Sequence, residues 1–98
     1  MAIKNLAVTI GASVTVFSKA SIRCNWFVCQ NNAAHAMAIG GSDSAVGTPG
    51  VGFQLAVSGN NYQGREYIGQ TNLALWYVAG TQNDLLNVTY DDGNDAND

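Results

Sequence analysis

The amino-acid sequence predicts an all-β domain, either an antiparallel β-sandwich or a jelly roll of about seven or eight short strands. A compact barrel is the alternative topology. Three observations predict this class. Apolar and polar residues alternate with a period of two along most of the chain. No segment keeps the i, i+3, i+4 apolar spacing over the length that a helix needs, and turns rich in Gly and Asn separate the alternating segments.

The chain has 98 residues, which is enough for one domain with one thin core. We expect this domain to occupy residues 1–90, in which residues 1–5 can form an N-terminal arm. Residues 91–98 hold four of the seven acidic side chains and almost no apolar ones. They are therefore expected to form an acidic, flexible tail.

Three strands are predicted in the first third of the chain, over residues 6–10, 13–17 and 21–30. In the third strand, one face is expected to point inward and consists of Ile22, Cys24, Trp26 and Val28. The other face is expected to be partly covered and consists of Arg23, Asn25, Phe27 and Cys29. Because the two cysteines fall on opposite faces, a disulfide between them is unfavourable, and both are interpreted as small buried hydrophobic residues.

The remaining strands are predicted from the same alternation. Residues 33–39 place His35, Met37 and Ile39 on one face, and a loop rich in turn formers follows over residues 40–50. Alternation resumes over residues 51–57, and a short strand is expected over residues 65–68. The last two strands, about 72–79 and 84–90, are joined by "GTQN", which has the chemistry of a hairpin turn.

Composition and charge exclude several classes of function. Charged residues are 11% of the chain, the net charge is −3, and the four cations are scattered singly, so no basic patch is expected to bind nucleic acid. No apolar run approaches the length of a membrane span. The N-terminal apolar residues alternate with polar ones, unlike the continuous apolar stretch of a signal peptide, so we expect folding in a cytosol with reduced thiols.

The sequence also argues against catalysis and against bound cofactors or metals. His35 is the only histidine, and no orienting partner or oxyanion site can be assigned to it. Two cysteines and one histidine are too few for a metal site. The glycines of residues 40–52 have neither a following helix nor a lysine, unlike a phosphate-binding loop, and the acidic end lacks the distant glutamate of a calcium loop.

One segment is apolar on both faces. Residues 72–79 place Leu73, Leu75 and Tyr77 on one side of a strand and Trp76 and Val78 on the other. A chain this short has little material to cover a second face, and interfaces are enriched in aromatic residues. We therefore predict self-association through Trp26, Phe27, Trp76 and Tyr77. The alternative is that one or two of these side chains are half-buried at the ends of the sandwich.

Two stretches, "VGTPGVGFQLAVSGNN" and "LALWYVAGTQNDLLNVTY", resemble small accessory proteins of tailed-bacteriophage virions over roughly residues 45–90. The resemblance implies a capsid decoration (cement) protein, a non-catalytic and often trimeric domain on the exterior of the virion. Such a protein docks on the outer surface of the lattice formed by the major capsid protein and stabilises it. It also implies that an N-terminal arm reaches the capsid, which here corresponds to Ala2, Ile3, Lys4 and Asn5.

A head-fibre or tail accessory module that binds a host receptor or glycan is the second hypothesis. It is based on Tyr62, Tyr67, Trp76 and Tyr77, which lie near segments rich in Asn and Gln and have the stacking groups that sugars require. The two hypotheses differ in partner. A decoration protein binds shells in many copies, whereas a recognition module binds cells or glycans in few.

Overall fold

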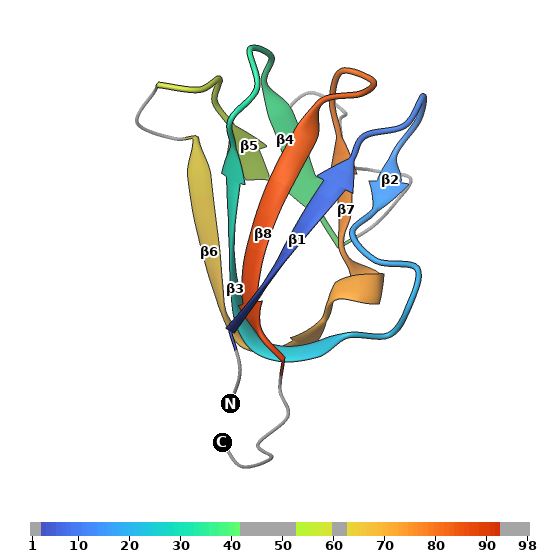
Figure 1. The fold of residues 1–98 in the computed structure, drawn as a ribbon, viewed down its shortest axis with the longest axis vertical. Coiled ribbons are helices and arrows are strands. Elements are labelled where there is room, and N and C mark those ends of the chain that lie inside the picture. The colour runs from blue at the N-terminus through green and yellow to red at the C-terminus, as the bar shows by residue number, and fades with distance from the viewer. Residues whose placement is uncertain (1–2, 42–52, 60–62, 93–98) are drawn as a thin grey trace.

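Eight strands form two four-stranded antiparallel sheets in a computed structural model of the chain, which describes residues 3–41, 53–59 and 63–92 (Figure 1). The first sheet, in spatial order, contains β1 (Ile3–Thr9), β8 (Leu85–Asp91), β3 (Arg23–Asn31) and β6 (Gly64–Asn72). The second sheet contains β2 (Thr15–Val16), β7 (Tyr77–Ala79), β4 (Met37–Gly40) and β5 (Phe53–Leu55). A 3₁₀ turn, η1 (Leu73–Leu75), lies between β6 and β7.

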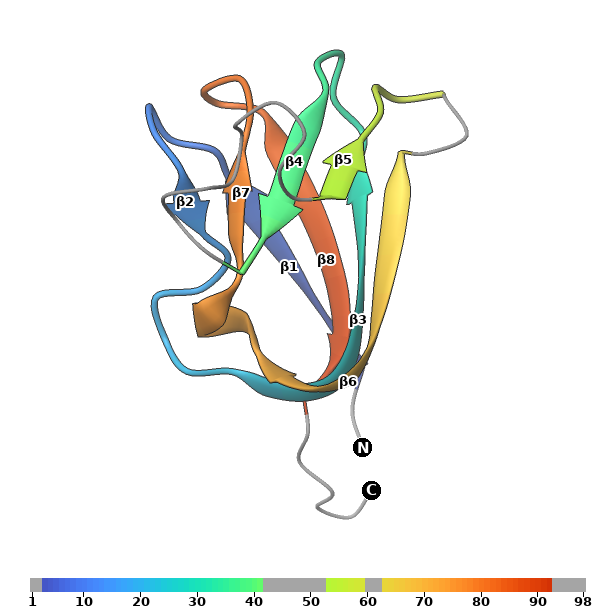
Figure 2. The ribbon, with the colours of Figure 1, turned by 180° about the vertical axis from the view of Figure 1, so that it is seen from behind.

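The order of the strands is that of a jelly roll. The antiparallel pairs are β1 with β8, β2 with β7, β3 with β6 and β4 with β5, as if one long ribbon of paired strands had been rolled up. Further pairs, β3 with β8 and β4 with β7, complete the two sheets. Figure 2 shows the second sheet in front of the first. The predicted all-β class is therefore confirmed, and the strand order is that of the jelly-roll alternative.

The core lies between the inner faces of the two sheets. Alternate residues of the long strands point into it, as a period of two requires. The most deeply buried apolar side chains are Ile10, Phe27, Cys29, Ile39, Leu55, Leu73, Val78, Leu86 and Val88. Among the described residues, no helix has the length and apolar character needed to span a membrane.

A β-bulge in the pairing of β3 with β6 reverses the predicted faces of β3 from Trp26 onward. The register with β6 shifts between Cys24 and Trp26, so the residues that point inward are Cys24, Phe27, Cys29 and Asn31. Asn25 of β3 lies opposite two residues of β6, Gly69 and Gln70, so β3 advances one residue fewer than β6 at this point and its later side chains change face. The prediction that Trp26 and Val28 face inward is therefore wrong. The prediction that the two cysteines lie on opposite faces is also wrong, since both are buried on the inner face.

Asp91 holds the bulge. Its Oδ1 accepts hydrogen bonds from the backbone N–H of Asn25 at 2.5 Å and of Trp26 at 3.2 Å, and its Oδ2 accepts one from Asn25 Nδ2 at 2.8 Å. Asp91 is the last residue of β8 and is 1% exposed. The predicted flexible tail therefore does not include Asp91, because its carboxylate binds backbone donors of β3. Residues 93–98 lie outside the described part of the chain.

The predicted hairpin between the last two strands is wrong. Residues 72–79 do not form one strand, because η1 interrupts them, and Asn72 Oδ1 accepts hydrogen bonds from the N–H groups of Ala74 and Ile22. β7 and β8 belong to different sheets. The turn between them is bound instead to Ile10, whose N–H donates to the carbonyl of Asp84 and whose carbonyl accepts from Asn83. Polar turn residues here carry the chain from one sheet to the other.

Candidate functional site

Four aromatic rings gather between the sheets. Phe27 of β3 lies edge-on to Trp76 with ring centroids 4.9 Å apart, and it stacks with Tyr67 of β6 at 5.6 Å. Tyr67 and Trp76 lie 5.1 Å apart, and Phe17 packs edge-on against Phe27 at 5.8 Å. The indole Nε1 of Trp76 donates to Thr71 Oγ1 at 2.9 Å. These contacts fix the rings and leave a partly exposed aromatic wall beside β6.

A pocket of about 110 Å³ opens beside this wall, between the end strands β5 and β6. Its lining is mainly aromatic and apolar and consists of Phe27, Ile39, Phe53, Arg65, Glu66, Tyr67 and Trp76. The guanidinium of Arg65 lies 6.0 Å from the ring of Phe53, and its Nε donates to the carbonyl of Gln54 at 3.4 Å. An apolar pocket with a few polar groups at its rim has the general character of a binding site.

The four residues predicted for self-association do not share one surface. Phe27 is 1% exposed and belongs to the core, so its prediction as a contact residue is wrong, and the β-bulge is the reason. Trp76 packs its ring against the core. Tyr77 is half-buried in β7 of the second sheet. Only Trp26, which is partly exposed, faces away from the core on the first sheet.

An apolar patch on the outer face of the first sheet was not found from the sequence. Ile68 of β6 is 78% exposed and lies directly opposite Trp26 of β3, and Val28 is also exposed. The short strand predicted over residues 65–68 includes Ile68, but the prediction does not say which face of the sheet Ile68 occupies. A signal was present, since Arg65 and Tyr67 alternate with Glu66 and Ile68 in a strand of period two.

The predicted N-terminal arm is part of the sheet from Ile3 onward. Ile3, Lys4 and Asn5 belong to β1 and pair with Asp91, Tyr90 and Thr89 of β8, and Thr89 Oγ1 donates to Asn5 Oδ1 at 2.7 Å. The prediction of a free arm is therefore wrong for these three residues, because β8 offers them a complete partner. Ala2 lies outside the described residues. Even so, β1 is an end strand of its sheet, and Ile3 is 64% exposed.

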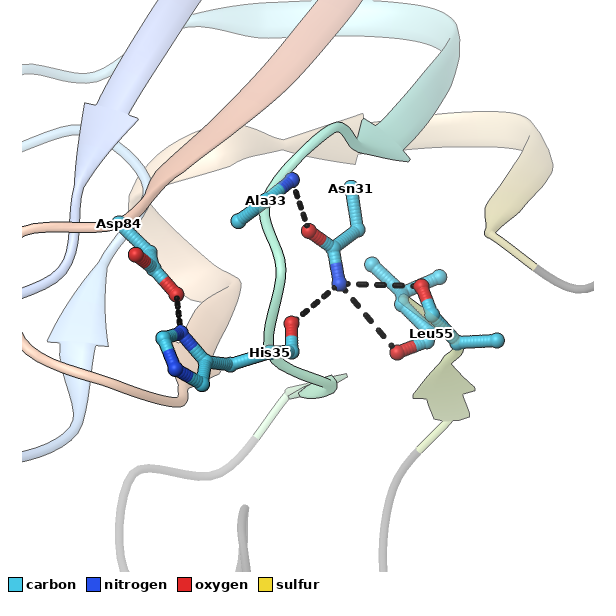
Figure 3. A network of polar contacts seen from close by, with 6 residues as sticks. Asn31, Ala33, His35, Leu55 and Asp84 are labelled. Carbon is cyan, nitrogen blue, oxygen red and sulfur yellow. Dashed lines mark hydrogen bonds and ion pairs between the residues drawn. The ribbon is translucent and has the colours of Figure 1, made fainter. Parts of the chain in front are cut away.

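The only histidine makes a polar contact at one end of the sandwich (Figure 3). His35 Nδ1 lies 2.9 Å from Asp84 Oδ2, and this pair links the loop before β4 to the turn before β8. His35 is not on a strand, since β4 begins at Met37 rather than at the predicted residue 33.

Asn31 connects two loops at the same end of the sandwich. Its side chain is fully buried, and its Nδ2 donates to the carbonyls of His35 at 2.8 Å and Ala56 at 3.0 Å, with a longer contact to Leu55. Its Oδ1 accepts from the N–H of Ala33 at 2.8 Å. One amide thus satisfies groups from two loops, which is a structural role.

The cysteine thiols are poor nucleophiles. Burial raises the pKa of Cys24 to about 11, with a further contribution from the charge of Asp91, and burial raises the pKa of Cys29 to about 12. Both are free thiols. Within the described residues, no group of three or more His, Cys, Asp or Glu side chains is placed to hold a metal ion.

The residues of the glycan hypothesis are only partly brought together. Tyr67 and Trp76 are adjacent, but Trp76 contacts the rings of Phe17, Phe27 and Tyr67 and donates its N–H to Thr71. Tyr77 lies on β7, and Tyr62 is outside the described residues. Trp76 is therefore packed against other rings of its own chain and only partly exposed.

No protein-family model, curated protein or solved structure matches this chain.

Proposed function

We propose that the chain is a non-catalytic decoration (cement) protein of a tailed-phage virion, which docks on the outer surface of the major capsid lattice and stabilises it. Two considerations support this beyond the sequence resemblance. Viral capsid domains are among the known uses of the jelly roll, although a fold alone does not define a function. The low content of charged residues also lets copies of the chain lie close together on a shell.

One observation carries the proposal, namely that both end strands of the first sheet present exposed isoleucines. Ile3 lies on β1 and Ile68 on β6, and within the described residues each strand pairs on one side only. Long end strands with apolar side chains promote association unless something covers them. A capsid lattice offers such a cover at many equivalent positions, and many weak contacts add up to strong attachment.

Co-sedimentation with purified undecorated shells tests this proposal. We expect saturable binding in many copies per shell. Deleting residues 2–5 is a poor test, because residues 3–5 pair with β8. Ile3→Lys is sharper, since a lysine on an end strand blocks strand pairing without removing a core contact. It should weaken shell binding by at least about tenfold.

Leu85→Lys is the matched control, because Leu85 is half-exposed on β8, opposite Thr9 at the far end of the sheet from Ile3. It should bind shells as the parent protein does. A parent protein that stays in the supernatant, while binding host cells or glycans, would contradict the proposal and favour the head-fibre or tail module.

Self-association as a trimer is part of the same proposal. The outward-facing Trp26 and Ile68 are the described residues best placed for it, since they lie opposite each other on the outer face. Mass measurement in solution should show an oligomer that Trp26→Lys converts to a monomer. A parent protein that is monomeric at every concentration tested would count against a trimer.

A further inference from the structure

Two features of the molecule meet at one place, the side of β6 that faces away from β3 and the mouth of the aromatic pocket. β6 is nine residues long and is an end strand of the first sheet. Within the described residues it pairs only with β3. Tyr67 and Arg65, which line the pocket, belong to the same strand. β5, which carries Phe53, lies beside the first half of β6, since Arg65 of β6 donates to the carbonyl of Gln54 of β5.

The free side of a strand defines the chemistry of its partner. Its N–H and C=O groups alternate at the spacing of an extended polypeptide, so another extended backbone is the ligand that satisfies them in series. Recognition of this type gains specificity when a nearby pocket takes one side chain of the added strand. Here the pocket lies on the inner side of β6, where an added strand directs alternate side chains.

The pocket is sized for a single side chain. Its volume of about 110 Å³ is somewhat smaller than the roughly 150 Å³ cavity that holds a benzene molecule. Its walls are the rings of Phe27, Phe53, Tyr67 and Trp76 together with Ile39. A branched aliphatic side chain is therefore the best match in size and polarity.

The charge and exposure of the β6 side chains determine which residues suit the other positions of the added strand. In an antiparallel added strand, the residue opposite Tyr67 points toward the pocket. The residues opposite Ile68 and Glu66 then lie on the outer face. An apolar side chain is complementary to Ile68, and a basic side chain is complementary to Glu66. The residue opposite Arg65 returns to the inner face, where an acidic side chain is complementary.

A second copy of β6 does not meet these requirements. When two identical antiparallel strands keep their inner faces on the same side, even-numbered residues pair with even-numbered ones. Glu66 then lies opposite Glu66, Ile68 or Gln70 of the other copy, and Arg65 never lies opposite a carboxylate. The charges of β6 therefore favour a different segment.

We infer that β6 and the aromatic pocket form a peptide-binding edge, which takes an extended segment with the pattern apolar, aliphatic, basic, acidic. The aliphatic side chain enters the pocket, and the basic and acidic side chains face Glu66 and Arg65. Only the assignment of this segment to a capsid subunit rests on the function proposed above. In that setting β1 and β6 give the protein two separate contacts, with which one copy can join two neighbouring subunits.

The acetylated and amidated peptide TVLKE is the probe, because it places valine, leucine, lysine and glutamate opposite Ile68, Tyr67, Glu66 and Arg65. Titration of the ¹⁵N-labelled protein should shift the backbone amides of β6 and the indole N–H of Trp76 in a saturable manner. Replacing the leucine of the peptide by aspartate should weaken binding by at least about tenfold, since the pocket cannot bury a carboxylate. TVLEK, with the charges exchanged, should also bind more weakly.

Variants of the protein locate the site. Phe53→Ala removes an exposed wall of the pocket and should weaken TVLKE binding several-fold, whereas Leu85→Ala, a similarly exposed apolar residue on β8, should not. The inference is overturned if TVLKE gives no saturable shift up to about 1 mM. It is also overturned if the shifts cluster on β1, or if Phe53→Ala and Leu85→Ala behave alike.

The peptide titration contains no shells, so the two proposals fail separately. Peptide binding without shell binding would reject the decoration function and leave the peptide-binding edge intact. Shell binding that depends on Ile3, without any binding of TVLKE, would reject the peptide-binding edge alone.

Discussion

Replacing Asp91 by asparagine should destabilise the fold far more than its position near the end of the last strand implies. The carboxylate accepts three hydrogen bonds from Asn25 and Trp26, which hold the β-bulge of β3. Asparagine keeps one acceptor oxygen for the two backbone N–H groups. Its amide nitrogen, however, faces the donor Nδ2 of Asn25, so that bond is lost and the other two lose the help of a negative charge.

The size of the effect follows from these contacts. A hydrogen bond to a charged group contributes about 1.5–3 kcal/mol net, and Asp91 is almost fully buried. One bond lost and two weakened should lower the free energy of unfolding by about 2–3 kcal/mol at neutral pH. Glu66→Gln is the matched control, since it removes a carboxylate charge from an exposed position on β6 and should cost less than about 0.5 kcal/mol.

The effect should also depend on pH. Burial opposes ionisation of Asp91, but the hydrogen bonds from Asn25 and Trp26 outweigh it and hold the pKa of this carboxyl below its ordinary value of 3.8. A lowered pKa in the folded state adds stability above the unfolded pKa, and this stability is lost as the pH falls through the folded value. Asparagine does not titrate, so the difference between parent and variant should shrink below about pH 3.8.

Urea unfolding followed by tryptophan fluorescence measures this difference directly. The parent, Asp91→Asn and Glu66→Gln are compared at neutral pH and at about pH 2.5. The reasoning is refuted if Asp91→Asn costs no more than Glu66→Gln at neutral pH, or if its cost is the same at both pH values.

Three further predictions concern the core and the backbone. Both thiols, Cys24 and Cys29, should resist Ellman's reagent in the folded protein at neutral pH and react once it unfolds, and rapid reaction before unfolding would contradict their burial. Asn31→Ala should lower the free energy of unfolding, measured by urea unfolding, by about 2–4 kcal/mol, because it leaves buried carbonyls unpaired. The control Asn87→Ala, at an exposed position, should lower it by less than about 1 kcal/mol. Gly69→Ala should lower the melting temperature by about 4 °C or more, because a φ of +142° disfavours a side chain, and an unchanged melting temperature would show that the backbone relaxes.

The fold class could be predicted because it depends on a local property. A period of two places one set of side chains inward in each strand, and this requires no knowledge of the partner strand. Residues 85–91 illustrate this, since Leu86, Val88 and Tyr90 alternate with more exposed neighbours as their sequence indicates.

The bulge in β3 could not be predicted in the same way. It depends on a carboxylate 66 positions later in the chain than Asn25, and nothing in the local pattern of residues 21–30 marks a shift in register. A register shift of one residue was enough to exchange Trp26 and Phe27 between surface and core. Of the predicted interface residues, Phe27 is therefore in the core and Trp26 lies on the outer face.

The turn before β8 shows a second limit. Polar residues and a positive φ at Asn83 are compatible with a hairpin and equally with a passage between two sheets. Ile10 determines which of these two arrangements forms. It lies far away in the sequence and hydrogen-bonds to the turn through its own backbone. The pocket between β5 and β6 depends on the same long-range arrangement, and the sequence alone did not predict it.

The pairing of Ile3 with Asp91 has a practical consequence for engineering. The polypeptide enters the fold and leaves it at adjacent points of neighbouring strands. A domain with this property can be placed within a surface loop of a host protein with short connections, or have its ends joined and new ends opened elsewhere. The same arrangement directs any fused reporter or enzyme to one pole of the domain, so that the opposite pole, which carries the loop before β4 and the turn before β8, stays uncovered (Figure 1).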